Sequence, residues 1–583
     1  MATDQEIEIL VKKHALLNAT THDGRADKGA VIGRVMAECS DLRTESKLVS
    51  EIVAKVLSEI NSLTLGQQRS LLEREFPETV QAEIQKKKDQ SKKDLERGFE
   101  LPKLVDAEVG EVVTRFPPEP NGFMHIGHAK AAFLGSEYAK MYKGKFILRF
   151  DDTNPAAEKK EYYDAFRDSF AWLGIKPDLI KNSSDDMERY YGLAEKMLEG
   201  GYAYICSCSQ EKMRELRGIG EACEHRSQPP EENLQRWRKM ISGDLGKSEA
   251  TFRFRGNMKS LNTTMRDPVL LRIIDTPHPL LGNKFFVWPT YDFAGPIEDS
   301  LDGVTHAMRS KEYELRDELY HSILNSLELR DPRIIEFSRL KLQNTTLSKR
   351  TLGKLIREKQ VQGWDDPRLP TISALERRGF LAEAIHEFIL SMGVSKVESE
   401  PTWDLLESFN RKLLDPIAKR YFFVPDPVKV QVSDAPELLV TLKYHPERNY
   451  GERQVATHGT FFIPSYDADR LKVGSRIRLI EAYDIQINEI QNSGIILATY
   501  KGEERTADVP KLQWVAVGEE YPMMVKLPGP LLQNDEFNPK SLQSIKGIAE
   551  SAAGQIKIGE IIQFVRFGFC RMDSPGTAIR AHS

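Results

Sequence analysis

Residues 112–133, VVTRFPPEPNGFMHIGHAKAAF, restrict the fold of this chain more than any other stretch. Its first apolar residues are typical of a buried strand, and the prolines that follow cannot continue a strand. Gly122 allows a tight turn, and His125 and His128 then lie three residues apart, on one face of a first helical turn. The pattern predicts a strand, a turn and a helix whose N-terminus faces a ligand.

The start of this helix suits a nucleotide. Unpaired N–H groups and the positive end of the helix dipole attract phosphate, and Gly127 leaves room for a flat base or a phosphate group. Two imidazoles add hydrogen-bond donors where charge builds on a departing pyrophosphate. Histidines with this spacing are also typical of a metal pair or of surface residues, and the flanking residues favour ATP.

A known family carries the same motifs. RFPPEPNGFMHIGH (115–128) resembles the HIGH signature of class I aminoacyl-tRNA synthetases, in the form used by the glutamyl and glutaminyl enzymes. The resemblance continues in RFDDTNP (149–155), in WPTYDFAGPIEDSLDGVTHAMRSKEYELRD (288–317) and in TLSKR (346–350). It covers most of the chain from about residue 112 onward and is closest to the archaeal and eukaryotic type of glutamyl enzyme.

The resemblance implies a glutamate–tRNA ligase. Such an enzyme takes L-glutamate, ATP with Mg²⁺ and tRNA(Glu), and whether tRNA(Gln) is also an acceptor is left open. The rival interpretations are a glutaminyl-tRNA synthetase, an inactive RNA-binding or scaffold relative, and a small-molecule nucleotidylyltransferase. The last of these shares the histidine-bearing helix start but has no need of the β-rich C-terminal part.

Length and composition set further bounds. At 583 residues with 40% apolar content, the chain should divide into roughly three to five domains. A net charge of −5 argues against a uniformly basic surface, while 29% charged residues allow local basic faces. The chain has five cysteines, no signal-peptide pattern and no run of about 18 apolar residues, so we expect a cytoplasmic protein without membrane attachment.

The periodicity of residues 1–98 is helical, so we predict a helical N-terminal domain, which could bind a protein partner. It ends in a lysine-rich segment, EIQKKKDQSKKDLER (83–97). This segment is either a solvated helix or linker, or an arm that touches tRNA or another protein.

The rest of the chain is expected to be α/β followed by β. From residue 104 to about 270 strands alternate with helices, which predicts a parallel sheet with ligands at the carboxyl ends of its strands. We assign residues 99–350 to a Rossmann-like catalytic domain with an insertion at about 204–290, and 351–420 to a helical connector, which resembles the stem-contact region of the family. Short β-rich runs after residue 421 predict β-barrels over 421–583, which the resemblance implies bind the anticodon.

Four residues are candidates for binding glutamate. Asp151 follows an apolar strand; paired Asp could cap the next turn, but the resemblance implies that it contacts the amino group of the substrate. The resemblance also implies that Tyr291 lines the amino-acid pocket and that Arg115 reaches the substrate carboxylate. Arg309 stands where glutaminyl enzymes have a small uncharged residue, and a guanidinium pairs with a carboxylate as a fork. The alternative is that Arg309 is an ordinary arginine on a surface helix.

The resemblance also assigns the nucleotide site. Its catalytic members are His125, His128 and Lys349, because the first lysine of the usual KMSKS loop is absent here, with Arg350 as a second candidate for the phosphate. The full set of ATP-binding candidates is Glu119, Pro120, Asn121, His125, Gly127, His128, Ala129, Arg339, Leu340, Leu347, Ser348 and Lys349.

Three of the five cysteines cluster between residues 206 and 223. Cys206 and Cys208, followed by Cys223 and His225, could form a structural tetrahedral Zn²⁺ site. The spacing of the first pair is shorter than in the usual zinc knuckle, so reduced free cysteines are the alternative.

Overall fold

The computed structural model describes residues 4–21, 24–39, 42, 46–79, 101–398, 400–504 and 508–583. The chain divides into two compact units, Met1–Phe99 and Glu100–Ser583. No helix in these described ranges is both long and apolar enough to cross a membrane.

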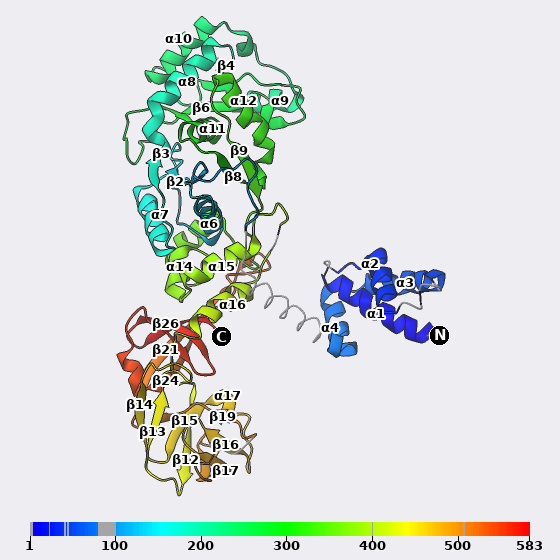
Figure 1. Cartoon of the computed structure of the whole chain (residues 1–583), viewed down its shortest axis with the longest axis vertical. Coiled ribbons are helices and arrows are strands. Elements are labelled where there is room, and N and C mark those ends of the chain that lie inside the picture. Colours follow the sequence, from blue (N-terminus) through cyan, green and yellow to red (C-terminus); the bar gives the residue numbers. More distant parts are fainter. Residues whose placement is uncertain are drawn as a thin grey trace. The chain divides into compact units, whose positions relative to one another are not determined.

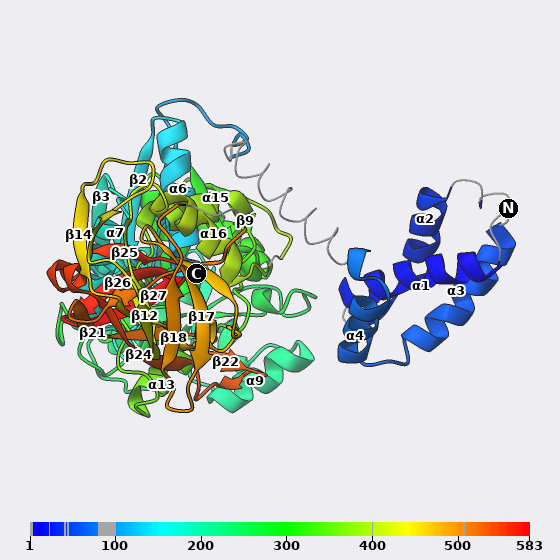
Figure 2. The same cartoon turned by 90° about the horizontal axis from the view of Figure 1, so that it is seen from below.

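The first unit is helical, as predicted. Its helices are α1 (Asp4–Thr21), α2 (Lys28–Glu38), α3 (Ser46–Ile60) and α4 (Leu65–Glu75), coloured blue in Figures 1 and 2. Their apolar faces bury Val11, Leu16, Val31 and Val53 in one core. The predicted lysine-rich segment 83–97 lies outside the described residues.

The second unit begins with the predicted parallel sheet. Its first three strands are β1 (Val113–Phe116), β2 (Lys145–Phe150) and β3 (Leu179–Asn182), linked by helices α6 (Ile126–Met141) and α7 (Lys160–Trp172). Strands β8 (His306–Ser310) and β9 (Arg333–Phe337) are also parallel to each other. The Thr305 N–H donates to the Val113 carbonyl oxygen over 2.9 Å, which sets β8 beside β1. The carboxyl ends of these strands therefore meet near the start of α6.

An antiparallel sheet interrupts the parallel one within the expected insertion. It contains β4 (Ala203–Cys206), β5 (Thr251–Phe254), β6 (Val269–Ile273) and β7 (Val287–Pro289), in that order. The parallel rhythm expected up to about residue 270 is therefore broken after β3. β4 and β5 pair antiparallel although helices lie between them, and loops rather than crossover helices join β5 to β6 and β6 to β7. The helical segments around this sheet and the later strands are η2 (Ser183–Asp186), α8 (Met187–Glu199), α9 (Gln210–Ile219), η3 (Glu224–Ser227), α10 (Pro230–Ile241), η4 (Thr263–Met265), α11 (Tyr291–Leu301), η5 (Lys311–Arg316) and α12 (Asp317–Leu327).

A helical connector follows. It consists of α13 (Lys349–Arg357), α14 (Ile372–Arg378), α15 (Ala382–Met392) and α16 (Trp403–Leu414). In Figure 1 the last three lie between α6 and strands β21 and β26. The connector also holds the start of α6, because the N–H of Ile126 donates to Pro370 and that of Ile372 donates to Met124, both over 2.9 Å.

The C-terminal part contains two seven-stranded sheets, as expected for β-barrels. In the first, the two edge strands are β10 (Lys419–Tyr421) and β11 (Phe423–Pro425), separated along the chain by Phe422 alone. The edge strands of the second, β19 (Lys511–Leu512) and β20 (Val515–Ala516), are separated by two residues. Because the edges of each sheet are joined so closely, each sheet curls back on itself.

The inner strands of the first sheet are β25 (Ile561–Phe564), β26 (Gly568–Ser574), β27 (Thr577–His582), β21 (Glu520–Pro528) and β24 (Leu542–Glu550). Those of the second are β16 (Arg476–Leu479), β17 (Asp484–Ile490), β18 (Ile496–Tyr500), β12 (Pro427–Ser433) and β15 (Thr460–Pro464). The remaining elements are the pairs β13 (Leu438–Lys443) with β14 (Glu452–Thr457) and β22 (Leu532–Gln533) with β23 (Glu536–Phe537), and the short helices α17 (Ser465–Ala468) and η6 (Ser551–Gln555).

Candidate active site

A cavity of about 710 Å³ opens where the carboxyl ends of β1, β8 and β9 meet the N-termini of α6 and α13. This is the edge at which open parallel sheets bind ligands. Five cationic side chains line this cavity (Arg115, Arg309, Arg339, Lys341 and Lys349). Two carboxylate side chains, those of Glu312 and Glu400, also line it. The excess of positive charge suits an anionic ligand.

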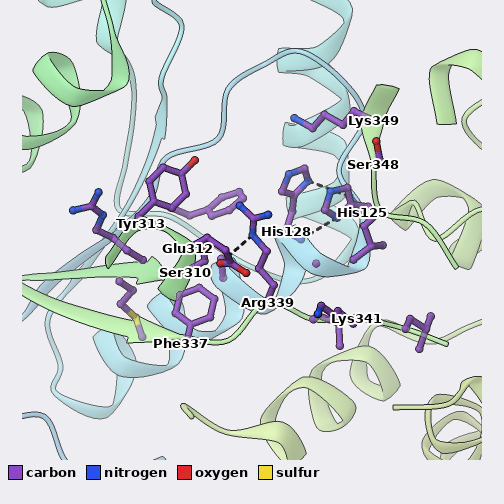
Figure 3. A pocket seen from close by; sticks show the side chains of 18 of the residues that line it. His125, His128, Ser310, Glu312, Tyr313, Phe337, Arg339, Lys341, Ser348 and Lys349 are labelled. Carbon is purple, nitrogen blue, oxygen red and sulfur yellow. Dashed lines mark hydrogen bonds and ion pairs between the residues drawn. The ribbon is translucent and has the colours of Figure 1, made fainter. Parts of the chain in front are cut away.

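The two histidines of the opening motif cap α6 reciprocally. Nδ1 of His125 accepts from the backbone N–H of His128 over 3.2 Å, and Nδ1 of His128 accepts from the N–H of His125 over 3.3 Å. Their rings stack with centroids 3.6 Å apart and an angle of 14° between the planes (Figure 3). Gly127 favours this arrangement, because a Cβ atom there would lie 3.0 Å from Cε1 of His125, a tight contact.

Both imidazoles are neutral at physiological pH. Burial, followed by the charge of Lys349, lowers the pKa of His125 to about 3, and burial likewise lowers the pKa of His128 well below its usual value. Since each Nδ1 accepts a backbone hydrogen, each neutral ring carries its proton on Nε2. The pair thus supplies two neutral N–H donors beside the cavity.

Lys349 lies across from the histidines at the start of α13 (Figure 3). Its Nζ contacts Oδ1 of Asn121 and lies 3.5 Å from the carbonyl oxygen of Glu119, so it is held by the turn after β1. Burial lowers the pKa of Lys349 to about 8. Gly122, in the same turn, leaves room for this side chain, because a Cβ atom there would lie 3.1 Å from Cδ of Lys349.

Arg309 lies in a strand and not on a surface helix. It belongs to β8, its side chain is 3% exposed, and it lines the cavity. Nη1 donates to Oδ1 of Asp317 over 3.0 Å. Its Nε atom is buried and has no hydrogen-bond partner among the described residues. The guanidinium therefore keeps N–H groups that no described residue accepts.

Arg115 lines the same cavity but is bound differently. Its Nε and Nη2 atoms donate to the two carboxylate oxygens of Asp299, each over 2.9 Å, and Nη1 donates to the carbonyl oxygen of Met308 over 2.6 Å. Three of its five N–H groups are thereby used inside the protein. Arg115 can offer a ligand at most the remaining two.

Asp151 does not line the cavity. It follows β2, and its Oδ1 atom accepts from Nε of Arg149 over 2.8 Å and from the hydroxyl of Ser183 over 2.9 Å. The contact with a substrate amino group therefore stays a prediction.

Most of the other predicted residues come together. Eleven of them line the cavity: Arg115, His125, Gly127, His128, Tyr291, Arg309, Arg339, Leu340, Leu347, Ser348 and Lys349. Four predicted ATP-binding residues do not, namely Glu119, Pro120, Asn121 and Ala129. Ala129 is fully buried, whereas Glu119 and Asn121 hold Lys349.

Sequence reasoning missed several residues of this site. Glu312 lines the cavity and pairs with Arg339, with 3.1 Å between Oε2 and Nε (Figure 3). Tyr313 also lines the cavity, and its ring centroid is 4.9 Å from that of Tyr291. Both lie within four residues of Arg309, in the stretch that carries the resemblance, and this proximity was the only available signal.

The four predicted metal ligands lie together, away from the cavity. The donor atoms of Cys206, Cys208, Cys223 and His225 are all within 4.8 Å of one another. The Sγ atoms of Cys206 and Cys223 are 3.8 Å apart, the separation expected for two sulfurs that share a tetrahedral Zn²⁺ at about 2.3 Å each. The donor set and its size therefore fit zinc.

Comparisons with known proteins agree with this architecture. A family model described as "tRNA synthetases class I (E and Q), catalytic domain" matches residues 111–416, and two models for the anti-codon binding domains of that class match 418–501 and 511–573. The glutamate–tRNA ligase of Cenarchaeum symbiosum is 41% identical over 98% of this chain and 98% of its own length. That of Nitrosopumilus maritimus is 41% identical, covering 99% of this chain and 100% of its own. That of Pyrococcus abyssi is 42% identical, covering 97% of each.

Proposed function

This chain belongs to the class I tRNA synthetases of the glutamyl and glutaminyl group, and from that premise we propose that it is a glutamate–tRNA ligase. It activates L-glutamate with ATP and transfers the glutamyl group to tRNA(Glu). The observation that carries the choice of amino acid is Arg309, whose buried guanidinium lines the cavity and pairs with a single carboxylate among the described residues, that of Asp317.

Arg309 would bind the side-chain carboxylate of glutamate. A guanidinium and a carboxylate form two parallel hydrogen bonds, whereas the amide of glutamine has only one acceptor oxygen and would oppose N–H to N–H. Hydrogen bonds to charged groups contribute about 1.5–3 kcal/mol, so Arg309 alone could favour glutamate by roughly tenfold to a hundredfold. This is the main argument against a glutaminyl enzyme.

Further contacts with glutamate would come from residues at the strand ends. We assign a second contact with the side-chain carboxylate to the two unused N–H groups of Arg115, and one wall of the amino-acid pocket to Tyr291. Asp151 is the candidate for the substrate amino group, and it would need to share its Oδ1 with Arg149 and Ser183 or use Oδ2.

The nucleotide would lie against the start of α6. In the first step an oxygen of the glutamate α-carboxylate attacks the α-phosphorus of ATP, the bond from that phosphorus to the bridging oxygen breaks, and pyrophosphate leaves. The Nε2–H groups of His125 and His128 and the ammonium of Lys349 would stabilise charge on the phosphates. Mg²⁺ enters with ATP as part of the substrate.

The second step transfers the glutamyl group. A terminal ribose hydroxyl of the tRNA, the 2′-hydroxyl in class I enzymes, attacks the carbonyl carbon of the adenylate, and AMP leaves with the electrons of the broken bond. The two C-terminal sheets would bind the anticodon of tRNA(Glu), in line with the family models that match them. Use of tRNA(Gln), a protein partner for the N-terminal helices and a cytoplasmic location all stay predictions.

We further propose that the cluster of Cys206, Cys208, Cys223 and His225 holds a structural Zn²⁺. All four positions of a tetrahedral ion would be filled, so no site would remain for a reacting water. The ion would link the end of β4 to the start of η3 and thereby stabilise the insertion.

A charging assay tests the function. Purified protein is incubated with ATP, radiolabelled glutamate or glutamine, and transcripts of tRNA(Glu) and tRNA(Gln). We expect glutamate to be attached to tRNA(Glu) and no attachment of glutamine. Transfer of glutamine to tRNA(Gln) would indicate a glutaminyl enzyme, and absence of both activities would indicate an inactive relative.

Pyrophosphate exchange with the Arg309→Cys variant tests the assignment of the amino-acid site. We expect the KM for glutamate to rise at least tenfold while the KM for ATP stays within about twofold. Arg333→Cys is the matched control, because Arg333 lies on the neighbouring strand β9 with its side chain 47% exposed. An unchanged KM for glutamate in Arg309→Cys would remove the basis of the assignment.

A further inference from the structure

Arg309 has one ionic partner among the described residues. This partner is Asp317, the first residue of α12, whose Oδ1 atom lies 3.0 Å from Nη1 of Arg309. Arg309 lines the substrate cavity, whereas Asp317 does not. Asp317 is 25% exposed and faces a second cavity, of about 680 Å³, on its other side.

Aromatic rings surround the same guanidinium. Its Cζ atom lies 5.6, 5.5 and 5.2 Å from the ring centroids of Tyr291, Tyr313 and Tyr320. Contacts of this kind attract a cation but are weakly directional, so they do not fix which edge of the guanidinium faces the cavity. A hydrogen bond to a carboxylate is directional. Among the described residues, Arg309 donates one such bond, to the carboxylate of Asp317.

The position of this bond on the guanidinium matters. A carboxylate binds an arginine most specifically through two parallel hydrogen bonds, and the Nε–Nη2 edge offers such a pair. In Arg115 that edge is already taken by Asp299. In Arg309 the bond to Asp317 engages Nη1, and Nε is buried without a partner, so Nη2 is the nitrogen left for a ligand in the cavity.

We propose that Asp317 is a positioning residue for glutamate recognition: by holding Nη1 it keeps Nη2 of Arg309 turned toward the side-chain carboxylate of the substrate. The proposal rests on the assignment of Arg309 as the receptor of that carboxylate. It adds that the selectivity for glutamate depends on a residue that does not touch the substrate. Without Asp317, Arg309 could rotate among the three tyrosine rings and would hold Nη2 at the substrate less often.

Asp317→Ala is the main test, with glutamate-dependent pyrophosphate exchange as the readout. We expect the KM for glutamate to rise about tenfold, the KM for ATP to change less than twofold, and the selectivity for glutamate over glutamine to fall. Asp317→Asn retains an acceptor oxygen at the same place and should lie between Asp317→Ala and the unmodified protein. If Asp317→Ala does not fold, Asp317→Asn carries the test, with an expected rise of about threefold in the KM for glutamate.

Asp331→Ala is the matched control. Asp331 lines the same outer cavity and bonds to His321 of α12, at 2.7 Å from Nδ1, but has no bond to Arg309. Its kinetic constants should equal those of the unmodified protein. Equal losses in Asp317→Ala and Asp331→Ala would indicate a general role of this surface and would contradict the proposal.

A double-mutant cycle separates this proposal from the assignment on which it rests. If Asp317 acts through Arg309, Asp317→Ala should have no further effect on the KM for glutamate in an Arg309→Cys background. Additive effects would overturn the positioning role and leave the assignment of Arg309 intact. An unchanged KM in Arg309→Cys alone would instead overturn the assignment.

Discussion

Asp299 binds the Nε–Nη2 edge of Arg115 with both of its carboxylate oxygens, at 2.9 Å each, and both side chains are almost fully buried. Oδ1 of the same carboxylate also accepts from Nη1 of Arg149 over 2.9 Å. Asp299 lies on α11 and the two arginines lie on β1 and β2. This carboxylate therefore ties a helix to the two strands that carry the site.

Replacing Asp299 with asparagine should destabilise the second unit. The change leaves the buried guanidinium of Arg115 without a compensating charge and removes one of the three carboxylates that pair with Arg149. Breaking a buried pair in this way typically costs about 3–5 kcal/mol. We expect a clear fall in the midpoint of urea-induced unfolding, which tryptophan fluorescence measures. The exposed pair of Asp331 and His321 provides a control, since Asp331→Asn should change stability by less than about 0.5 kcal/mol. Equal midpoints for the two variants would show that Asp299 is not important for stability.

The same pair predicts a dependence of stability on acid pH. Burial alone would raise the pKa of Asp299, but Arg115 and Arg149 outweigh it and lower the pKa to about 2. Because the folded-state pKa lies below the unfolded value of about 3.9, the stabilising contribution is present above pH 4. It should be lost as the pH falls from about 4 to 2, and the Asp299→Asn variant should lack this part of the acid transition.

Lys349 predicts a dependence of catalysis on alkaline pH. Burial lowers its pKa to about 8, and only the protonated form can stabilise phosphate charge. The value of kcat/KM for ATP in pyrophosphate exchange should therefore fall as the pH rises through about 8. In Lys349→Arg, whose guanidinium stays charged, this decline should move beyond the measurable range. A decline at the same pH in both proteins would assign it to another group.

His128→Ala should reduce adenylate formation far more than tRNA binding. The variant removes the Nε2–H donor at the phosphates and the acceptor for the N–H of His125. We expect a loss of at least a hundredfold in kcat for pyrophosphate exchange, the usual scale for removing a donor to developing charge. The Kd for tRNA, measured by filter binding, should change less than twofold. Losses of similar size in both quantities would indicate misfolding.

Much of this site could be predicted from the sequence because it follows a simple rule of topology. The carboxyl ends of parallel strands meet at one edge, so Arg115 at the end of β1 and Arg309 at the end of β8 reach one cavity across 194 positions of sequence. Their partners could not be predicted. Asp299 and Asp317 occupy helical positions where an acidic residue is commonplace, and only the three-dimensional packing shows that each one faces an arginine.

The fold, like the site, could be predicted only in part. Alternating and apolar runs were enough to predict strands after residue 421, since the period of side-chain burial is a local property. Strand pairing is not local: β10 and β11 are three-residue segments separated by one residue, yet they form opposite edges of one sheet. The antiparallel order of β4 to β7 was likewise hidden, because helices α9 and α10 between β4 and β5 continue the alternation of strands and helices.

The cysteine cluster yields the last prediction, that each chain contains one zinc ion. Atomic emission should detect this zinc in protein that has not been exposed to a chelator. The Cys206→Ser variant should lose the zinc, because the three remaining ligands bind it far more weakly. Cys39→Ser is the control, since Cys39 lies in the N-terminal unit, remote in sequence from the cluster. None of the four ligands lines the substrate cavity, so removal of zinc should impair transfer to tRNA more than pyrophosphate exchange. If protein without zinc charges tRNA at the full rate, this would instead indicate that the three cysteines are reduced and that the cluster holds no metal.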